Sequence, residues 1–314
     1  MIQDYFKNCA IGWNRFWFTP TDAAILALIR IATGLILFYS HWVWGLELAT
    51  FFSNEGALPA NYRDLLFENH HWVWSHFDFV SSPAIVWTIH WIGLGVIMMF
   101  ALGLCTRVTA PLSLLLAISY ANRAAGAQFG LDQIICFLCL YLALGNCGAR
   151  FSLDQYFFSK QNGRAGGWLS HSSATSPWNT IALRLIQLHM CLVYLFAGLG
   201  KLQGSTWWDG TAIWYSLSSY EYQTFDLTWL AEHLWFVNLV TLVAVAWEIT
   251  YPFLIWNRLA RPIYLLIAIA VHLGIGLAMG MLTFGFIMLA GNLAFLPNEW
   301  LKATRRRLLP ESGQ

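Results

Sequence analysis

The residue with the clearest chemical potential is a lysine at the end of an apolar segment. Residues 181–200 are mostly apolar, and Lys201 follows them directly within the sequence AGLGKLQGSTWWDGTA. A lysine at the rim of a membrane-spanning helix has two common roles. It either extends its charge to the membrane interface, or it lies desolvated in a polar cavity, where its neutral form becomes accessible as a base. The sequence leaves both roles open, a structural anchor and a general base.

A polar stripe leads along the same segment to this lysine. Its members recur at steps of three and four, which places them on one face of a helix. They are Arg184, Gln187, Cys191, Tyr194, Gly198 and Lys201. Such a stripe normally faces other helices, because a polar group that faces lipid without a partner costs several kcal/mol. Because Gly198 has no side chain, another group could approach closely beside Lys201. The stripe therefore predicts either contacts between helices or a polar binding site.

Three further ionisable groups lie inside apolar segments, namely Arg30, Glu248 and His272. Groups of this kind are candidates for function, although a structural ion pair is an equally common reason for their presence. Arg30 and Glu248 are one conceivable pair. His272 is either a core residue with a satisfied hydrogen bond or a group that moves protons near neutral pH.

The cysteines and histidines give only weak evidence for a metal site. Cys136 and Cys139 form a C-x-x-C pair inside an apolar segment, without a second Cys or His pair at ligand spacing. We therefore predict no metal. Histidines near the outer membrane rim leave an alternative open, and they are His41, His70, His71, His76 and His90.

The elements that position these groups are membrane helices. The chain has 314 residues, of which 58% are hydrophobic and 11% charged, against about 25% charged residues in soluble domains. Seven or eight apolar runs each approach the ~20 residues that cross the hydrocarbon core. The expected spans are 23–45, 85–104, 108–122, 131–148, 181–201, 234–256, 262–281 and 283–298. We predict an all-α, polytopic membrane helical bundle with about eight transmembrane helices.

The basic residues orient this bundle, because lysine and arginine gather in short cytoplasmic loops. With eight spans, only Arg63 and Arg123 lie in outer loops. The inner side receives Lys7, Arg15, Arg107, Arg150, Lys160, Arg164, Arg258, Arg261, Lys302, Arg305, Arg306 and Arg307. Both termini are therefore expected in the cytoplasm.

The same map divides the chain into segments. The expected parts are an interfacial segment 1–22, a transmembrane domain 23–300 with a cytoplasmic linker 157–178, and a basic cytoplasmic tail 301–314. The outer loops 46–84 and 202–233 are acidic, which argues against a nucleic-acid partner and leaves the lipid bilayer. Tryptophan is enriched toward these loops, so they either roof an apolar cavity or simply anchor the chain at the interface.

Six segments, read in order, form a pattern. They are LIRIATGL around Arg30, LGLCTRVTAPLSLLLAISYANR from Leu102, LDQIICFLCLYLALGNCGARFSLD from Leu131, LRLIQLHMCLVYLFAGLGKLQGSTWWDGTA from Leu183, WEITYPFLIW from Trp247, and VHLGIGLAMGMLTFGFIMLAGNLAFLP from Val271. Together these segments resemble the HTTM family of membrane proteins, which includes the vitamin K-dependent γ-glutamyl carboxylases.

The resemblance implies a chemistry for particular residues. Lys201 matches the lysine proposed to deprotonate vitamin K hydroquinone, so a quinol is the implied cofactor, with O2 and CO2 as co-reactants. His272 matches a histidine of a late membrane helix. Asp132 lies nearest to the place of an active-site histidine and is similar to the bacterial HTTM pattern. Polar groups expected to line such a site are Arg30, Arg184, Gln187, Tyr194 and Glu248.

Two functions follow from the resemblance. The first is an enzyme that uses a lipophilic quinol to modify a peptide on the outer side of the membrane, as the carboxylases do with glutamate. The second is a non-catalytic factor for maturation or export of a small secreted peptide, because bacterial HTTM proteins include a maturation factor for the sporulation-delaying peptide toxin. Both place the protein in a bacterial inner membrane, and the sequence leaves open whether it is an enzyme.

Overall fold

The computed structural model describes residues 1–53, 56–57, 73–80, 82–159 and 173–297. Within these residues the regular structure is helical apart from two short strands, β1 (Thr21–Asp22) and β2 (Thr175–Ser176), which pair antiparallel. The chain divides into two compact units. The first comprises Met1–Arg184 and Pro297–Gln314, and the second comprises Leu185–Leu296.

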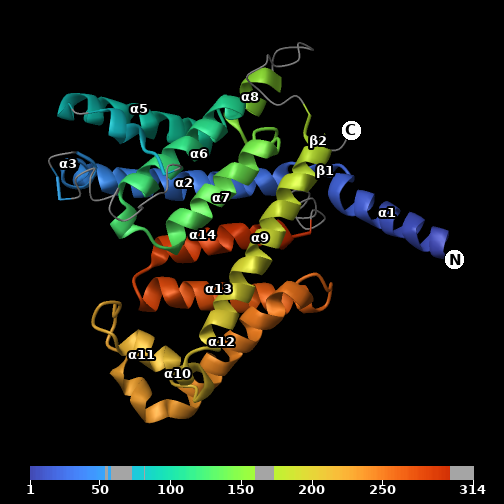
Figure 1. The fold of residues 1–314 in the computed structure, drawn as a ribbon, viewed down its shortest axis with the longest axis vertical. Coiled ribbons are helices and arrows are strands. Elements are labelled where there is room, and N and C mark those ends of the chain that lie inside the picture. Colours follow the sequence, from blue (N-terminus) through green and yellow to red (C-terminus); the bar gives the residue numbers. More distant parts are fainter. Residues whose placement is uncertain (54–55, 58–72, 81, 160–172, 298–314) are drawn as a thin grey trace, which may run out of the picture. The chain divides into compact units, whose positions relative to one another are not determined.

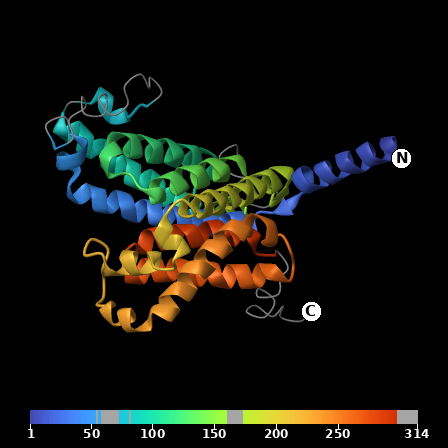
Figure 2. The same cartoon turned by 60° about the horizontal axis from the view of Figure 1, so that its bottom comes forward.

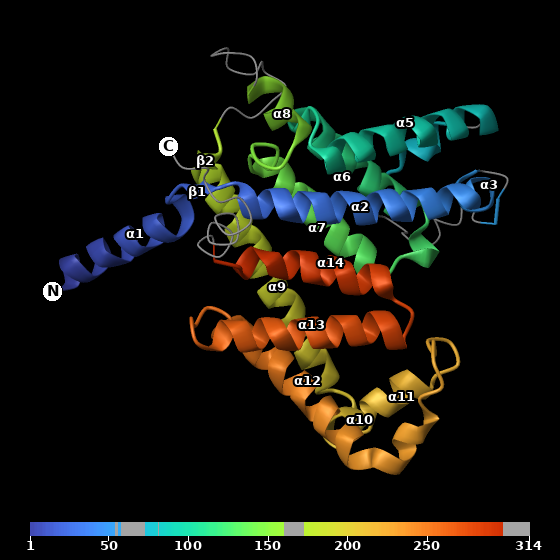
Figure 3. The same cartoon turned by 180° about the vertical axis from the view of Figure 1, so that it is seen from behind.

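Four long helices form the body of the first unit (Figures 1 and 3). Helix α2 packs against α5 and α7, and α6 packs against the same two helices, so that each of the four has two neighbours. Their bounds are α2 (Ala24–Leu46), α5 (Pro83–Leu102), α6 (Thr106–Arg123) and α7 (Gly130–Leu144). Shorter elements complete the unit, namely α3 (Leu48–Phe52), η1 (His76–Phe79), η2 (Ala125–Ala127) and α8 (Leu153–Ser159).

The N-terminal helix α1 (Ile2–Phe18) extends away from these four helices (Figures 1 and 3). None of its residues is buried, and its exposed side chains include Phe6 and Trp13 as well as Lys7. This mixture suits a helix that lies at a membrane surface. The structure thus shows a helix in the segment 1–22, and its interfacial position remains a prediction.

Helix α9 (Pro177–Lys201) begins in the first unit and continues into the second. The long helices of the second unit are α12 (Leu234–Leu254), α13 (Ala260–Ala278) and α14 (Leu282–Asn292). Helix α13 packs against both α12 and α14, and Figure 2 shows α13 and α14 side by side. The short elements are α10 (Ser205–Trp208), α11 (Ala212–Ser218), η3 (Thr228–His233) and η4 (Leu293–Phe295).

Each of the eight predicted spans coincides with one of these long helices. Among the described residues, five segments are long and apolar enough to cross a membrane, and they are α2, α5, α9, Thr228–Leu254 and α13. Two apolar helices are shorter, Gly130–Leu144 and Leu282–Phe295. The prediction of an almost entirely helical chain with several helices long and apolar enough to cross a membrane is confirmed, whereas the count of eight spans and the cytoplasmic location of both termini remain predictions.

Main-chain and side-chain bonds fix the place where α2 and α9 begin. Thr21 pairs with Ser176 in the short ladder, and the amide nitrogen of Asn179 donates to the carbonyl of Thr21 at 2.9 Å. Beside it, Arg150 forms an ion pair with Asp22, with Nη2 2.8 Å from Oδ2. Of the predicted linker 157–178, residues 157–159 belong to α8 and 175–178 to β2 and the start of α9. Residues 160–172 and the tail 301–314 lie outside the described part of the chain.

Candidate functional site

Lys201 ends α9 and forms an ion pair with Glu248 of α12. Its Nζ donates to Oε1 of Glu248 at 2.9 Å and lies 2.8 Å from Oε2. The side chains are 24% and 11% exposed, respectively. The ring of Trp207 lies 5.1 Å from the same nitrogen, which suits a cation–π contact. Lys201 is therefore a partly buried, paired cation rather than one that extends freely into solvent.

A close approach of the two helices makes this pair possible. A Cβ atom at Gly198 would stand 2.8 Å from Cγ1 of Ile249 and 3.1 Å from the Cβ of Glu248. Only a residue without a side chain leaves room for α12 at this point, one turn before Lys201. The expectation that Gly198 admits a neighbour beside Lys201 is confirmed.

A second polar group lies on the same face of α9, centred on Tyr194. Its hydroxyl lies 2.7 Å from Nε2 of His272 on α13 and accepts a hydrogen bond of 2.7 Å from the amide nitrogen of Asn292 on α14. The carbonyl oxygen of that amide accepts from the hydroxyl of Tyr251 on α12 at 2.6 Å. All four side chains are buried. Tyr194 is therefore the point at which four helices of the second unit are joined by polar contacts.

Aromatic rings enclose this network. The ring of Tyr194 lies 4.3 Å from that of Tyr251 and 4.7 Å from that of Trp247, measured between centroids. Phe284 packs edge-on against His272 at 6.1 Å. Lys201 follows Tyr194 by seven positions, so the two groups lie about 10 Å apart along the helix axis. We call the six polar residues Tyr194, Lys201, Glu248, Tyr251, His272 and Asn292 the α9 site.

The α9 site has the groups that proton transfer requires. An ammonium and a carboxylate at hydrogen-bond distance can share one proton, and so can a phenol and an imidazole. Among the described residues, Nδ1 of His272 has no hydrogen-bond partner although the residue is only 3% exposed. A buried polar atom without a partner costs about 1–3 kcal/mol, which makes it a candidate contact for a bound molecule.

Two other residues of the predicted stripe bond to backbone instead. The side chain of Gln187 donates to the carbonyl of Ala294 at 2.7 Å, within the second unit. Arg184 belongs to the first unit, where Nε donates to the carbonyl of Phe16 at 3.2 Å and the guanidinium lies 4.2 Å from the ring of the same residue. Arg184 thus attaches the end of α1, and Gln187 fixes the turn after α14.

Arg30 is buried inside the first unit and holds a loop. Its guanidinium donates to the carbonyls of Cys147 at 2.7 Å, Arg150 at 3.3 Å and Phe151 at 2.5 Å. Gly103, with φ +74°, passes so close that a Cβ there would stand 2.8 Å from Cζ of Arg30. The conceivable partner of Arg30, Glu248, is paired with Lys201 instead. Arg30 therefore stabilises the chain between α7 and α8.

Asp132, the third predicted catalytic residue, lies in the first turn of α7. Its Oδ2 accepts a hydrogen bond of 3.0 Å from the backbone nitrogen of Phe129. A carboxylate at this position satisfies an unpaired donor and interacts favourably with the helix dipole. The structure thus gives Asp132 a capping contact, and its catalytic role remains a prediction.

The sequence reasoning missed Asn292 and Tyr251. Both carried a signal, because Tyr251 follows Glu248 by three residues on the same helix face and Asn292 is a polar residue at the end of an apolar run. Neither signal identifies a partner. Of the predicted site residues, the structure joins Tyr194 to His272 and Lys201 to Glu248.

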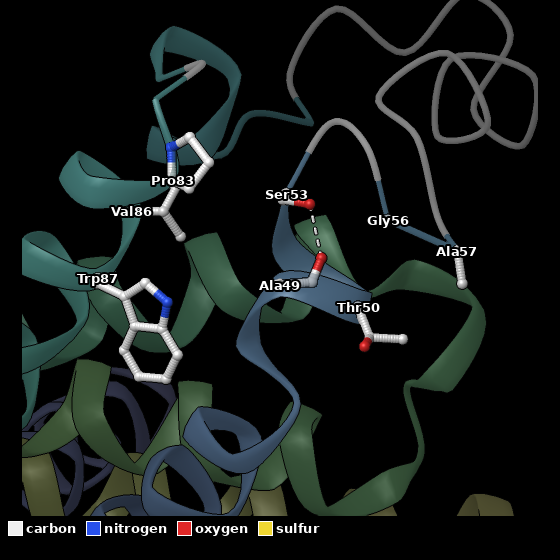
Figure 4. Close-up of a pocket in the computed structure, with 8 residues that line it drawn as sticks. All are labelled: Ala49, Thr50, Ser53, Gly56, Ala57, Pro83, Val86 and Trp87. Atoms are coloured by element: carbon white, nitrogen blue, oxygen red, sulfur yellow. Dashed lines mark hydrogen bonds between the residues drawn. The ribbon is translucent and has the colours of Figure 1, made fainter.

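The first unit contains a cavity and a separate group of histidines. The cavity has a volume of about 400 Å³ and lies between α3 and the start of α5 (Figure 4). It is lined by Ala49, Thr50, Ser53, Gly56, Ala57, Pro83, Val86 and Trp87. Beside it, Val86 packs into a core around the buried ring of Tyr120. This cavity lies in the unit that does not contain Lys201, and the roofing of an apolar cavity by the outer loops remains a prediction.

Three histidines surround Tyr120. Nδ1 of His90 lies 2.7 Å from its hydroxyl, and the rings of His41 and His76 lie 4.3 Å and 5.5 Å from its ring. Among the described residues no group of three or more His, Cys, Asp or Glu side chains is placed to hold a metal ion. His70 and His71 lie outside the described residues.

Comparison with known proteins gives one match. A family model for the HTTM domain matches residues 18–300, which is nearly the whole chain. No curated protein and no solved structure matches. The match includes all the helices from α2 to α14 and all six residues of the α9 site.

Proposed function

Because the chain belongs to the HTTM family, we propose that it is a membrane enzyme that binds a lipophilic quinol at the α9 site and takes a proton from it. The observation that carries this proposal is the ion pair of Lys201 and Glu248. Its side chains are 24% and 11% exposed, so the pair is largely shielded from water but still accessible to a bound molecule. The residues present offer contacts to a flat aromatic molecule with hydroxyl groups. The ring of Trp207 offers an aromatic face beside Lys201, and Nδ1 of His272 offers a polar contact.

The two charged residues act together in this proposal. Lys201 paired with a carboxylate is an ammonium ion, so it accepts a proton only after passing its own to Glu248, 2.9 Å away. After the transfer, Lys201 is again an ammonium ion and Glu248 a carboxylic acid. The net charge of the pair would thus rise from zero to +1, and the anion left by the quinol beside the Lys201 ammonium would balance it in a medium of low dielectric constant. The quinol would supply the reducing chemistry, and a peptide on the outer side would be the substrate.

The second candidate is a non-catalytic factor for maturation or export of a small peptide. The observation that favours it is the number of predicted site residues that bond to backbone, because Arg30, Asp132, Arg184 and Gln187 all do so. Such contacts hold a scaffold together. In this function the pair of Lys201 and Glu248 joins α9 to α12 and has no chemical role.

The experiment that separates the two uses purified protein in lipid nanodiscs with a soluble naphthohydroquinone. Oxygen uptake and quinone epoxide are measured for the wild type and for Lys201→Gln, Glu248→Gln and Lys7→Gln. The last variant removes an exposed lysine of α1 and is the matched control. The proposal expects activity in the wild type and the control, with a loss of at least about tenfold in the other two. Equal rates in all four proteins would reject it.

The peptide-factor alternative has its own test. Deletion of the gene should leave a secreted peptide unprocessed, and the Lys201→Gln variant should restore processing if the pair is only structural. Restoration by this variant, together with equal oxygen uptake in vitro, would favour the scaffold function over the enzyme.

A further inference from the structure

The hydrogen bonds around Tyr194 fix the direction in which its proton points. The amide of Asn292 is oriented by the carbonyl of Met288, which only accepts and lies 2.9 Å from Nδ2. The same nitrogen can therefore only donate to the hydroxyl of Tyr194 at 2.7 Å. Because the oxygen of Tyr194 already accepts this bond, its own O–H is available for the remaining partner, Nε2 of His272.

The direction of this bond decides the tautomer of His272. If Tyr194 donates to Nε2, the ring proton of neutral His272 is on Nδ1. In the opposite arrangement Nε2–H would donate to Tyr194, and the phenol O–H would be buried without an acceptor. That arrangement leaves two polar groups unpaired, the phenol O–H and a bare Nδ1, whereas the first leaves only Nδ1–H unpaired. Each unpaired buried group costs about 1–3 kcal/mol, so the first arrangement is favoured.

We propose that Tyr194, held by Asn292, sets the tautomer of His272 so that Nδ1–H is kept free as a donor to an oxygen atom of a bound lipophilic molecule. Tyr194 and Asn292 are positioning residues in this proposal, and His272 makes the contact. The ligand class is an oxygen acceptor such as a carbonyl or an ether. Only the identity of the ligand rests on the proposed function, because the tautomer is a property of the protein alone.

The surroundings of His272 leave Nδ1 without a side-chain partner among the described residues. The residue is 3% exposed, and Nδ1 has no hydrogen-bond partner among the described residues. Its ring is fixed by Tyr194 on one side and by Phe284 on another, at 5.8 Å and 6.1 Å between centroids. A ring held in this way cannot turn to find another acceptor without breaking the bond to Tyr194.

The tautomer can be observed directly by solid-state NMR of the protein in bilayers with ¹⁵N-labelled histidine at neutral pH. The chain has nine histidines, and the signals of His272 are identified by their loss in His272→Gln. The proposal expects a protonated Nδ1 and an unprotonated Nε2 in the wild type. The opposite assignment in the wild type would overturn it.

Two variants test the role of the positioning residues. Tyr194→Phe removes the donor to Nε2, so His272 should return to the Nε2–H tautomer that free histidine prefers. Asn292→Asp replaces the donor by an acceptor, which should draw the proton of Tyr194 away from His272 and invert the tautomer without loss of the phenol. The matched control is Tyr264→Phe, because Tyr264 bonds to Thr250 at 2.6 Å in the same unit. An unchanged tautomer in both test variants, or an equal change in the control, would contradict the proposal.

The ligand contact is tested with 2-methyl-1,4-naphthoquinone, whose oxygens are acceptors only. Its addition should shift the Nδ1–H signal of His272 in the wild type and leave Tyr194→Phe unaffected. If His272 has the Nδ1–H tautomer but its Nδ1–H signal does not shift when the quinone is added, the proposed ligand contact is wrong. A shift without any quinol-dependent oxygen uptake would instead support the contact and count against the enzyme, so the two proposals fail separately.

Discussion

Gly198 and Ile249 lie so close together that a Cβ at position 198 would stand 3.1 Å from the backbone nitrogen of Ile249 and 2.8 Å from its Cγ1. We expect Gly198→Ala to push α12 away and to lower the free energy of unfolding by about 1–3 kcal/mol, the usual cost of overpacking. Thermal unfolding in detergent measures the effect.

The neighbouring glycine gives a matched control for this change. A Cβ at Gly200, in the same helix, would meet nothing within 4 Å. Gly200→Ala should therefore leave stability unchanged or raise it by up to about 1 kcal/mol through helix propensity. Equal destabilisation by both substitutions would show that the close approach at Gly198 is not the cause.

The ion pair of Lys201 and Glu248 predicts strong coupling between the two residues. Lys201→Met leaves a carboxylate that is 11% exposed without its cation, and Glu248→Gln leaves an ammonium ion without its anion. The effects of the two single substitutions on the free energy of unfolding should add up to more than the effect of the double variant, which leaves no unpaired charge. The difference is a coupling energy of about 1–3 kcal/mol. A double-mutant cycle on unfolding in detergent measures it, and additive effects would contradict a direct pair.

The burial of the His76 side chain predicts that the protein loses stability in mild acid. Burial lowers its pKa from the usual 6.5 to about 4, with a smaller opposing effect of Asp78. Between these two pH values the unfolded chain binds more protons than the folded chain, so the free energy of unfolding falls as the pH is lowered from about 6.5 to about 4. Below pH 4 the contribution of His76 should no longer change.

The measurement compares thermal midpoints at several pH values in the wild type and in His76→Gln. The variant should be less sensitive to acid in this window, because glutamine does not titrate there. His233→Gln, which changes an exposed histidine, is the control. A wild type and a His76→Gln variant with parallel pH profiles would exclude His76 as the cause.

The hydrogen bonds of Arg30 predict that even a conservative substitution lowers the stability of the protein. Lysine keeps the charge but cannot donate from a planar fork to the three carbonyls that Arg30 reaches. Arg30→Lys should lower the free energy of unfolding by about 2 kcal/mol or more, since buried carbonyls lose charged donors. Arg258→Lys, at an exposed arginine, should have no measurable effect. A stable Arg30→Lys variant would show that the loop between α7 and α8 does not depend on the guanidinium.

The positions of the long helices could be predicted from the sequence because each is an apolar run of membrane length. The ends were less certain, since they depend on contacts distant in the chain. Helix α7 stops at Leu144 although the apolar run was expected to continue to 148. Gly145 takes an extended backbone conformation there, and Asn146 then donates its backbone nitrogen to the side chain of Asn179 at 2.9 Å. Helix α9 starts at Pro177, a residue that favours the first turn of a helix, four residues before the expected start.

The site was predictable along one helix and not across helices. Tyr194, Gly198 and Lys201 share a face because of their spacing, and periodicity shows this directly. Their partners are 47 to 98 residues away in the chain, and no local pattern states which helix packs against which. Composition could therefore identify Lys201 as unusual, but only the packing of α12 against Gly198 shows that Glu248 neutralises it.

The short ladder between Thr21 and Ser176 makes the covalent connection of the first unit partly redundant. The entrances of α2 and α9 are joined by this ladder and by the amide of Asn179, which donates to the carbonyl of Thr21. A break in the polypeptide between residues 160 and 172 would leave both bonds in place. The starts of α2 and α9 are therefore held together by main-chain and side-chain bonds as well as by the polypeptide itself.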